Sequence, residues 1–224
     1  MNKMLSESQV LSNYIFTEKQ KEQIQEILNE IRQHPRNYST QAIWVFDSEI
    51  GGIGAYCMPA NPVYNPFPGG INRSLFRPLQ YARSEIDIQN IHLSARYVIQ
   101  YSGMHLESLM RLILSNTSFL GHMRFYNSTF GKAVHKINQR KLLPKEIIDA
   151  LYKFIPIYNI SKHEINHSNE RERLFDPADA LISYFAARII GYRIILLLPP
   201  DSVPLVPSNK LLNYTEQTNN KGAL

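Results

Sequence analysis

The segment from residue 158 to residue 167 carries the side chains best suited to chemistry. It reads Tyr-Asn-Ile-Ser-Lys-His-Glu-Ile-Asn-His and contains Asn159, Lys162, His163 and His167. On a continuous helix, Asn159, His163 and His167 share one face at i, i+4 and i+8, with Lys162 beside them. An amide, an imidazole that titrates near neutral pH and an ammonium group together suit a phosphate-binding or general acid-base site. The same residue types also fit a solvated polar helix end.

Two of these histidines match the zincin pattern. In His163-Glu164-x-x-His167, two imidazoles one helical turn apart would bind Zn²⁺, and Glu164 would be the base for the bound water. The surroundings differ from those of a zinc helix, because a highly charged segment comes directly after. No glutamate lies between residues 185 and 197 to act as a third ligand. A zinc metallopeptidase with His163 and His167 as ligands therefore stays as an alternative.

The basic residues are concentrated in one stretch. The chain has 24 Lys+Arg against 19 Asp+Glu and a net charge of +5, yet residues 116–145 hold all their charge as Lys and Arg, with no acidic residue. Such a stretch can follow a phosphate backbone, or it can be a solvated helix face. Its position ahead of the Asn-Lys-His segment favours a phosphate-bearing ligand over a peptide. The residues expected to bind nucleic acid are Arg124, Lys132, Lys136, Arg140, Lys141, Arg171 and Arg173.

The elements that must position these groups follow helical periodicity. Five helices are predicted. The first runs from Thr17, which forms a capping box with Gln20, to Gln33, and a long one runs from Ser84 through Ile88 and Ile91 to Leu112. A short helix starts at about Ser128, the next is opened by Pro144 and kinked at Pro156, and the last is opened by Asp176-Pro177-Ala178-Asp179 and stopped at Gly191. The run Ala42–Phe46 fits a strand or a helical turn. Residues 47–80 alternate glycine with proline and are expected to form a structureless lid or dimer arm.

This pattern predicts an all-α bundle of four core helices, with an additional N-terminal helix and a long Gly/Pro-rich insertion. Its divisions are 1–83 for the N-terminal helix and arm, 84–198 for the bundle and 199–224 for a loosely ordered tail. His105 lies on the buried line of the long helix, where a hydrogen-bonded core histidine is expected. Glu107 and Arg111, at i and i+4, are expected to form a surface pair.

Composition excludes several classes. The longest apolar run, Ile194–Leu198, is too short to span a bilayer, and residues 1–12 lack the pattern of a secretory signal. A cytoplasmic protein without membrane partners is therefore expected. Cys57 is the single cysteine, which excludes intrachain disulfides and multi-cysteine metal sites.

Four features in order resemble the HEPN superfamily over residues 84–198. They are the segments Gly103-Met104-His105-Leu106-Glu107-Ser108-Leu109-Met110-Arg111, Phe130-Gly131, Ile157-Tyr158-Asn159-Ile160-Ser161-Lys162-His163-Glu164 and Asp179-Ala180-Leu181-Ile182-Ser183-Tyr184-Phe185. These all-α domains belong to prokaryotic toxin and defence systems. The resemblance implies a homodimer, metal-independent RNA cleavage by an Arg-x(4–6)-His motif, and an acidic residue facing that motif, here Glu107.

The sequence departs from the family motif at its centre. No histidine has an arginine five to seven residues before it, and Tyr158 occupies that position for His163. In an active enzyme, His163 would be the general acid or base, Lys162 would stabilise charge, and Asn159 would orient the phosphate or the imidazole. The hypothesis is an RNA-binding protein or metal-independent ribonuclease without cofactors, with a cognate antitoxin as a further partner. The third alternative is a non-catalytic protein-interaction module.

Overall fold

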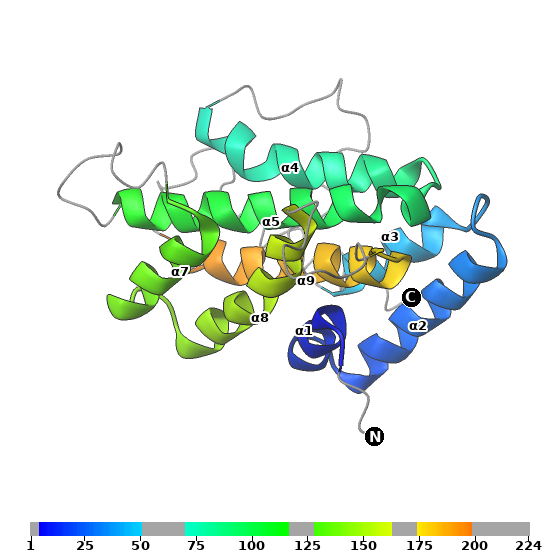
Figure 1. Cartoon of the computed structure of the whole chain (residues 1–224), viewed down its shortest axis with the longest axis horizontal. Helices are drawn as coiled ribbons and strands as arrows, with labels where there is room; N and C mark the ends of the chain where they lie inside the picture. Colours follow the sequence, from blue (N-terminus) through cyan, green and yellow to red (C-terminus); the bar gives the residue numbers. More distant parts are fainter. Residues whose placement is uncertain (1–4, 51–69, 117–127, 163–173, 199–224) are drawn as a thin grey trace, which may run out of the picture.

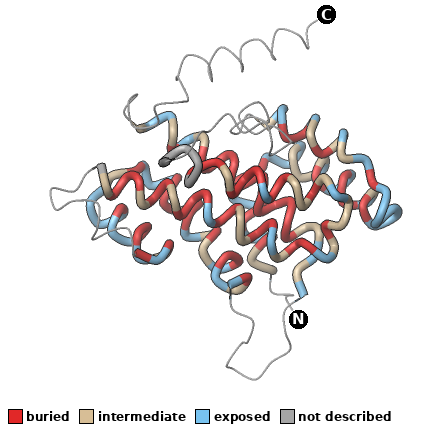
Figure 2. Tube along the Cα trace, turned by 90° about the horizontal axis from the view of Figure 1, so that it is seen from above, coloured by how far each residue is buried: buried red, intermediate tan, exposed pale blue. Residues whose placement is uncertain are grey.

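Two helices at the centre of the molecule, α5 (Ile91–Asn116) and α9 (Pro177–Ile195), pack against each other along their length. The computed structural model describes residues 5–50, 70–116, 128–162 and 174–198. Every position of α9 from Ala180 to Gly191 is buried, whereas the other helices are buried on one side only. Figures 1 and 2 show that the remaining helices surround this central pair, whose buried residues form the middle of the molecule.

The helix α4 (Gly70–Asp87) runs beside α5 and corrects two predictions. Residues 70–80 are helical although the sequence predicts a loop there, because apolar side chains from Leu75 to Ala82 are buried against α5 and outweigh the unfavourable Pro78. The predicted long helix from Ser84 is also wrong. It is two helices, and the chain reverses at Gln89, whose φ of 56° is left-handed.

The opposite side of α5 is covered by α7 (Phe130–Gln139) and α8 (Lys145–Lys162). Both helices were predicted. Pro156 lies inside α8, which continues for six more residues to Lys162. The C-terminal end of α8 lies against the middle of α5, where Tyr158 contacts Gly103 and Glu107.

Three N-terminal helices complete the fold: α1 (Glu7–Ile15), α2 (Glu18–Gln33) and α3 (Thr40–Glu49). The capping box of Thr17 and Gln20 is confirmed, and a second one at Ser6 starts α1, which was not predicted. The run from Ala42 to Phe46 is helical. The helix α1 packs on α8 and α9, and α2 packs on α9.

A buried ion pair ties α3 to α9. Arg188 and Asp47 contact each other with both side chains 0% exposed, and Arg188 Nη1 also donates to the Asp47 carbonyl oxygen at 3.0 Å. Burial lowers the pKa of Arg188 to about 9. Because each ion would be strongly destabilised without its partner, this pair couples the placement of α3 to the central helix.

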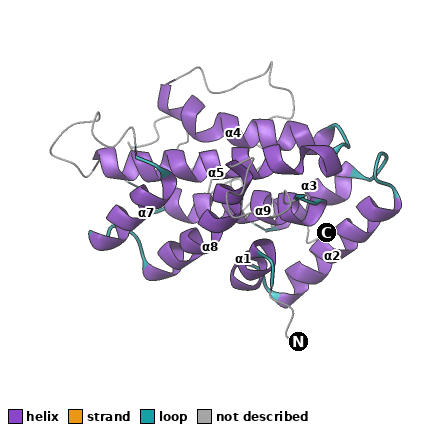
Figure 3. Cartoon of the chain, viewed as in Figure 1, coloured by secondary structure: helices purple, strands orange, loops and turns teal. Residues whose placement is uncertain are grey.

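The all-α class is confirmed. The described part of the chain contains eight helices. Figure 3 shows these helices in purple, with no strand in that part of the chain. Among these helices, none is both long enough and apolar enough to cross a membrane. The helix α4 runs through residue 83, where the sequence suggested a division.

Candidate phosphate-binding site and basic surface

The carboxylate of Glu107 is the centre of a polar cluster between α5 and α8. Its side chain is only 9% exposed. It accepts hydrogen bonds from Arg111 Nη2 at 2.5 Å, from Tyr158 Oη at 2.8 Å and from Lys162 Nζ at 3.5 Å. The predicted pair of Glu107 and Arg111 is confirmed, but its expected surface location is wrong for Glu107: the arginine is partly exposed, whereas the acid is buried and shared with α8. We call these four residues the Glu107 cluster.

A glycine allows α8 to approach α5 this closely. A Cβ atom built on Gly103 would lie 2.1 Å from Cδ2 of Tyr158, so the tyrosine ring rests directly on the helix backbone. The hydroxyl of Tyr158 then reaches Glu107, one turn further along α5. Burial and the adjacent carboxylate of Glu107 raise the pKa of Tyr158. The phenol therefore stays protonated and donates its hydrogen bond throughout the physiological range.

Lys162 ends α8 with its ammonium group between the cluster and solvent. Its Nζ lies 4.4 Å from the centroid of the Tyr158 ring, and its side chain is 42% exposed. The end of the helix is held in place because the carbonyl oxygen of Ser161 accepts from Arg96 Nε at 2.6 Å and from Gln100 Nε2 at 2.5 Å. Lys162 can thus contact a ligand without losing the ring beneath it.

Arg111 connects the cluster to the start of α7. Its Nε and Nη2 donate to the carbonyl oxygen of Ser128 at 3.3 and 3.2 Å, and its side chain is 35% exposed. With one carboxylate between two cations, the cluster has a net charge of +1. A partly exposed guanidinium and a partly exposed ammonium around one fixed acid are suited to holding a single phosphate.

The structure brings together two of the four predicted catalytic residues, Glu107 and Lys162. Asn159 is exposed on the last turns of α8. Tyr158 and Arg111 were not predicted as site residues. The helical periodicity placed Tyr158 on the buried side of its helix, but no signal in the sequence linked its hydroxyl to Glu107. The predicted site residues that lie outside the described residues are His163, Arg124, Arg171 and Arg173, together with the zinc candidate His167.

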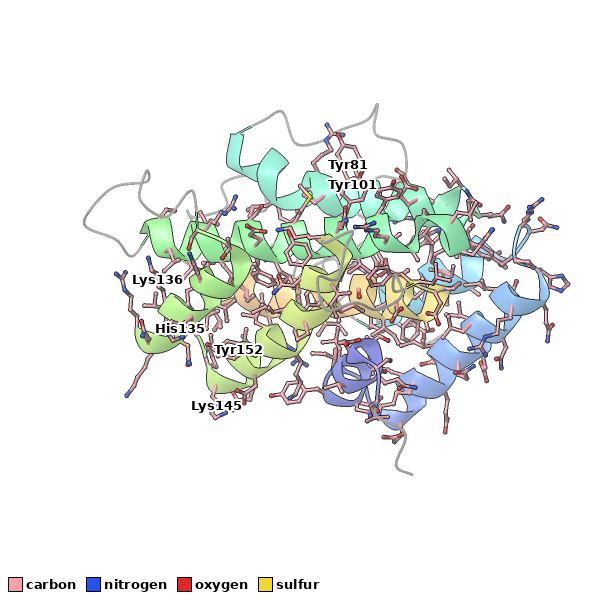
Figure 4. The ribbon with its side chains drawn as sticks, in the orientation of Figure 1. Tyr81, Tyr101, His135, Lys136, Lys145 and Tyr152 are labelled. Atoms are coloured by element: carbon pink, nitrogen blue, oxygen red, sulfur yellow. The ribbon has the colours of Figure 1, made fainter. Side chains whose placement is uncertain are left out.

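The outer side of α7 forms a basic surface. Four residues of the predicted nucleic-acid contact are exposed on it or directly after it: Lys132, Lys136, Arg140 and Lys141. The inner side of the same helix buries Phe130, Ala133, Val134 and Ile137, so its rotation is fixed. Figure 4 draws His135, Lys136 and Lys145 at the end of the molecule where α7 and α8 meet, with Tyr152 nearby. We call the four exposed basic residues Lys132, Lys136, Arg140 and Lys141 the α7 surface.

His105 is a structural residue, as predicted. It is fully buried, and its Nδ1–H donates to the Leu75 carbonyl oxygen at 2.7 Å. Desolvation lowers its pKa to about 4, which keeps the ring neutral. Its Nε2 packs against Gly191, where an added Cβ would lie 2.2 Å away. Gly191 is therefore a close-contact position inside α9, and the prediction that it ends the helix is wrong.

Comparisons with known proteins give no family. The chain matches no family model, no curated protein and no solved structure. Within the described ranges, no three His, Cys, Asp or Glu side chains come together as a metal site. The zinc alternative depends on His163 and His167, which lie outside those ranges.

Proposed function

We propose that the protein is a HEPN-like, all-α RNA-binding protein that acts in the cytoplasm, in a toxin or defence system. The observation that carries this proposal is the continuity of positive charge from the Glu107 cluster to the α7 surface. Arg111 binds the carbonyl oxygen of Ser128, just ahead of α7, and the ten residues of that helix extend the basic side chains by about 15 Å. A nucleic-acid backbone is the polymeric ligand whose charges repeat along such a track.

The Glu107 cluster supports a ribonuclease as the enzymatic form of this proposal. Lys162 and Arg111 would bind the scissile phosphate and stabilise the charge that develops on it. His163, the next residue after Lys162, would take the proton from the 2′-hydroxyl, whose oxygen attacks phosphorus while the 5′-oxygen leaves and receives a proton. This step needs no metal. Lys162 and Arg111 would together take the part of the family arginine that the sequence lacks.

Binding is tested with fluorescently labelled RNA at several salt concentrations. The triple variant Lys132→Gln, Lys136→Gln, Arg140→Gln is compared with Lys19→Gln, Arg32→Gln, Arg36→Gln, which removes the same charge from exposed positions on and just after α2. Each lost phosphate contact lowers the slope of log affinity against log salt by about 0.7 to 0.9. We expect the first triple variant to lose about two units of slope and the second to keep the wild-type slope. Equal behaviour of the two variants contradicts the proposed surface.

Catalysis is tested separately by incubating the protein with bulk RNA in the presence of a chelator. Cleavage that persists with the chelator and is lost in His163→Ala supports the ribonuclease. RNA binding without cleavage leaves a non-catalytic RNA-binding module. Stoichiometric zinc in the purified protein, lost in His167→Ala, would instead show the metal site that the zinc metallopeptidase alternative requires and would contradict the ribonuclease.

A further inference from the structure

The outer face of the α4–α5 pair exposes large apolar and aromatic side chains. Tyr81 is 43% exposed, Tyr97 is 53% exposed and Met104 is 45% exposed. Figure 4 draws Tyr81 and Tyr101 next to each other on this face, and their ring centroids are 5.4 Å apart. Tyrosine and methionine are enriched in the centres of protein interfaces, and a contiguous exposed group of them is unusual for an uncovered surface.

The charges on this face are arranged symmetrically about Tyr81. Arg77, Tyr81 and Glu85 occupy positions i, i+4 and i+8 on one side of α4. The guanidinium of Arg77 lies 5.9 Å from the centroid of the Tyr81 ring. Glu85 lies on the other side, near Tyr101, whose pKa is raised by burial and by this carboxylate. A positive and a negative side chain thus lie equally far, about 6 Å along the helix axis, on either side of one exposed aromatic ring.

This arrangement is complementary to itself. In an isologous interface, residue i of one copy contacts residue j of the other, and j contacts i. A two-fold axis through Tyr81, perpendicular to α4, places Arg77 opposite Glu85 of the partner subunit and Glu85 opposite Arg77 of the partner subunit. The apolar line Leu93, Tyr97, Tyr101 and Met104 on α5 lies beside this axis and supplies the apolar contact.

We propose that a second copy of this chain docks on the α4–α5 face in antiparallel orientation, so that the two α4–α5 pairs form a four-helix interface. Its balanced charge distinguishes this face from the α7 surface, which carries only positive charge. The two faces lie at different places on the molecule: Figure 4 draws Tyr81 and Tyr101 over α4 and α5, and Lys136 and Lys145 at the end where α7 and α8 meet. The interface therefore leaves the α7 surface uncovered, and it does not depend on the RNA-binding proposal.

A charge-exchange series tests the proposal by sedimentation velocity over a range of protein concentrations. We expect the wild type to be a dimer. Arg77→Glu and Glu85→Arg should each raise the dimer dissociation constant by about tenfold, because either change converts two attractive pairs into two repulsive ones. The double variant Arg77→Glu, Glu85→Arg should dimerise like the wild type, because exchanging both charges restores the pairing.

Two further variants control for folding and for the position of the contact. Tyr97→Arg should disrupt the dimer, whereas Val45→Arg on α3, which changes an equally exposed apolar residue elsewhere, should not. Circular dichroism checks that each variant is folded. The proposal is overturned by a monomeric wild type, by a dimer that neither single charge change weakens, or by a folded double variant that stays monomeric. None of these outcomes bears on the salt dependence of RNA binding, so the two proposals fail separately.

Discussion

Substituting alanine for Gly103 separates helix propensity from packing at the Glu107 cluster. Propensity alone predicts that the variant is more stable by about 1 kcal/mol, because glycine is unfavourable inside a helix. The new Cβ, however, would lie 2.1, 2.4 and 2.6 Å from three carbon atoms of the Tyr158 ring. Real Cβ atoms do not approach other atoms so closely, so the ring must move away from α5.

The expected cost comes from the contacts that the moving ring loses. Overpacking of a buried site costs about 1 to 3 kcal/mol. Loss of the 2.8 Å hydrogen bond from Tyr158 to the carboxylate of Glu107 adds about 1.5 to 3 kcal/mol. After the gain in propensity is subtracted, Gly103→Ala should lower the free energy of unfolding by about 1.5 to 5 kcal/mol.

Urea denaturation of four variants measures this difference. Gly103→Ala is compared with Gly131→Ala on α7, where nothing lies within 4 Å of the added Cβ and the change should be neutral or stabilising. In a Tyr158→Ala background the clash is absent, so Gly103→Ala should there be neutral or stabilising as well. A Gly103→Ala protein as stable as the wild type would show that α8 does not lie on α5 at this glycine.

Three other predictions concern separate parts of the molecule. Because the His105 pKa falls from 6.5 to about 4 on folding, the unfolded chain binds a proton more tightly, and acid favours unfolding. The contribution of the neutral His105 ring to stability should be complete above pH 6.5 and should decrease by roughly 3 kcal/mol as the pH falls to 4. Denaturation of His105→Gln over the same pH range should show no such decrease. Arg188→Met should lower the free energy of unfolding by about 3 to 5 kcal/mol by leaving Asp47 charged and unpaired, and adding Asp47→Leu should recover part of that loss in a thermal melt. Tyr152 on α8, near the α7 surface, is 38% exposed, and Tyr152→Ala should weaken binding of single-stranded RNA by about 1 to 3 kcal/mol through loss of base stacking, while Tyr152→Phe binds normally. An unchanged affinity of Tyr152→Ala in a titration would show that this ring does not contact RNA.

The local signals in the sequence predicted the starts of α2 and α9 correctly. The boxes at Thr17 and Asp176 involve residues three positions apart, so the sequence contains everything that determines them. The break at Gln89 was hidden because Ile88 and Ile91 continue the apolar periodicity across it. The helical stretch before Ser84 was hidden because its proline and glycines indicate a loop, and only burial against α5 overrides that preference.

The candidate site was predicted in part for the same reason. From a family resemblance, Glu107 was expected to face the motif segment; in the structure its carboxylate lies 3.5 Å from Lys162 Nζ at the end of α8. Tyr158 and Arg111 could not be assigned from sequence, because their roles depend on which residue of α5 lies under α8. That register is set by Gly103, whose missing side chain lets the Tyr158 ring lie on the backbone of α5.

The contacts of α8 with α5 depend on the number of residues that separate Arg96, Gln100, Gly103 and Glu107 along α5. Arg96 and Gln100 hold the end of α8, Gly103 accepts the Tyr158 ring, and Glu107 receives its hydroxyl. Each residue inserted into a helix rotates the remainder of that helix by about 100° and advances it by about 1.5 Å. A single insertion between Gln100 and Gly103 would therefore separate the anchors from the acid. Length changes in related chains should consequently occur outside residues 96–107, even where the residue types within that interval differ.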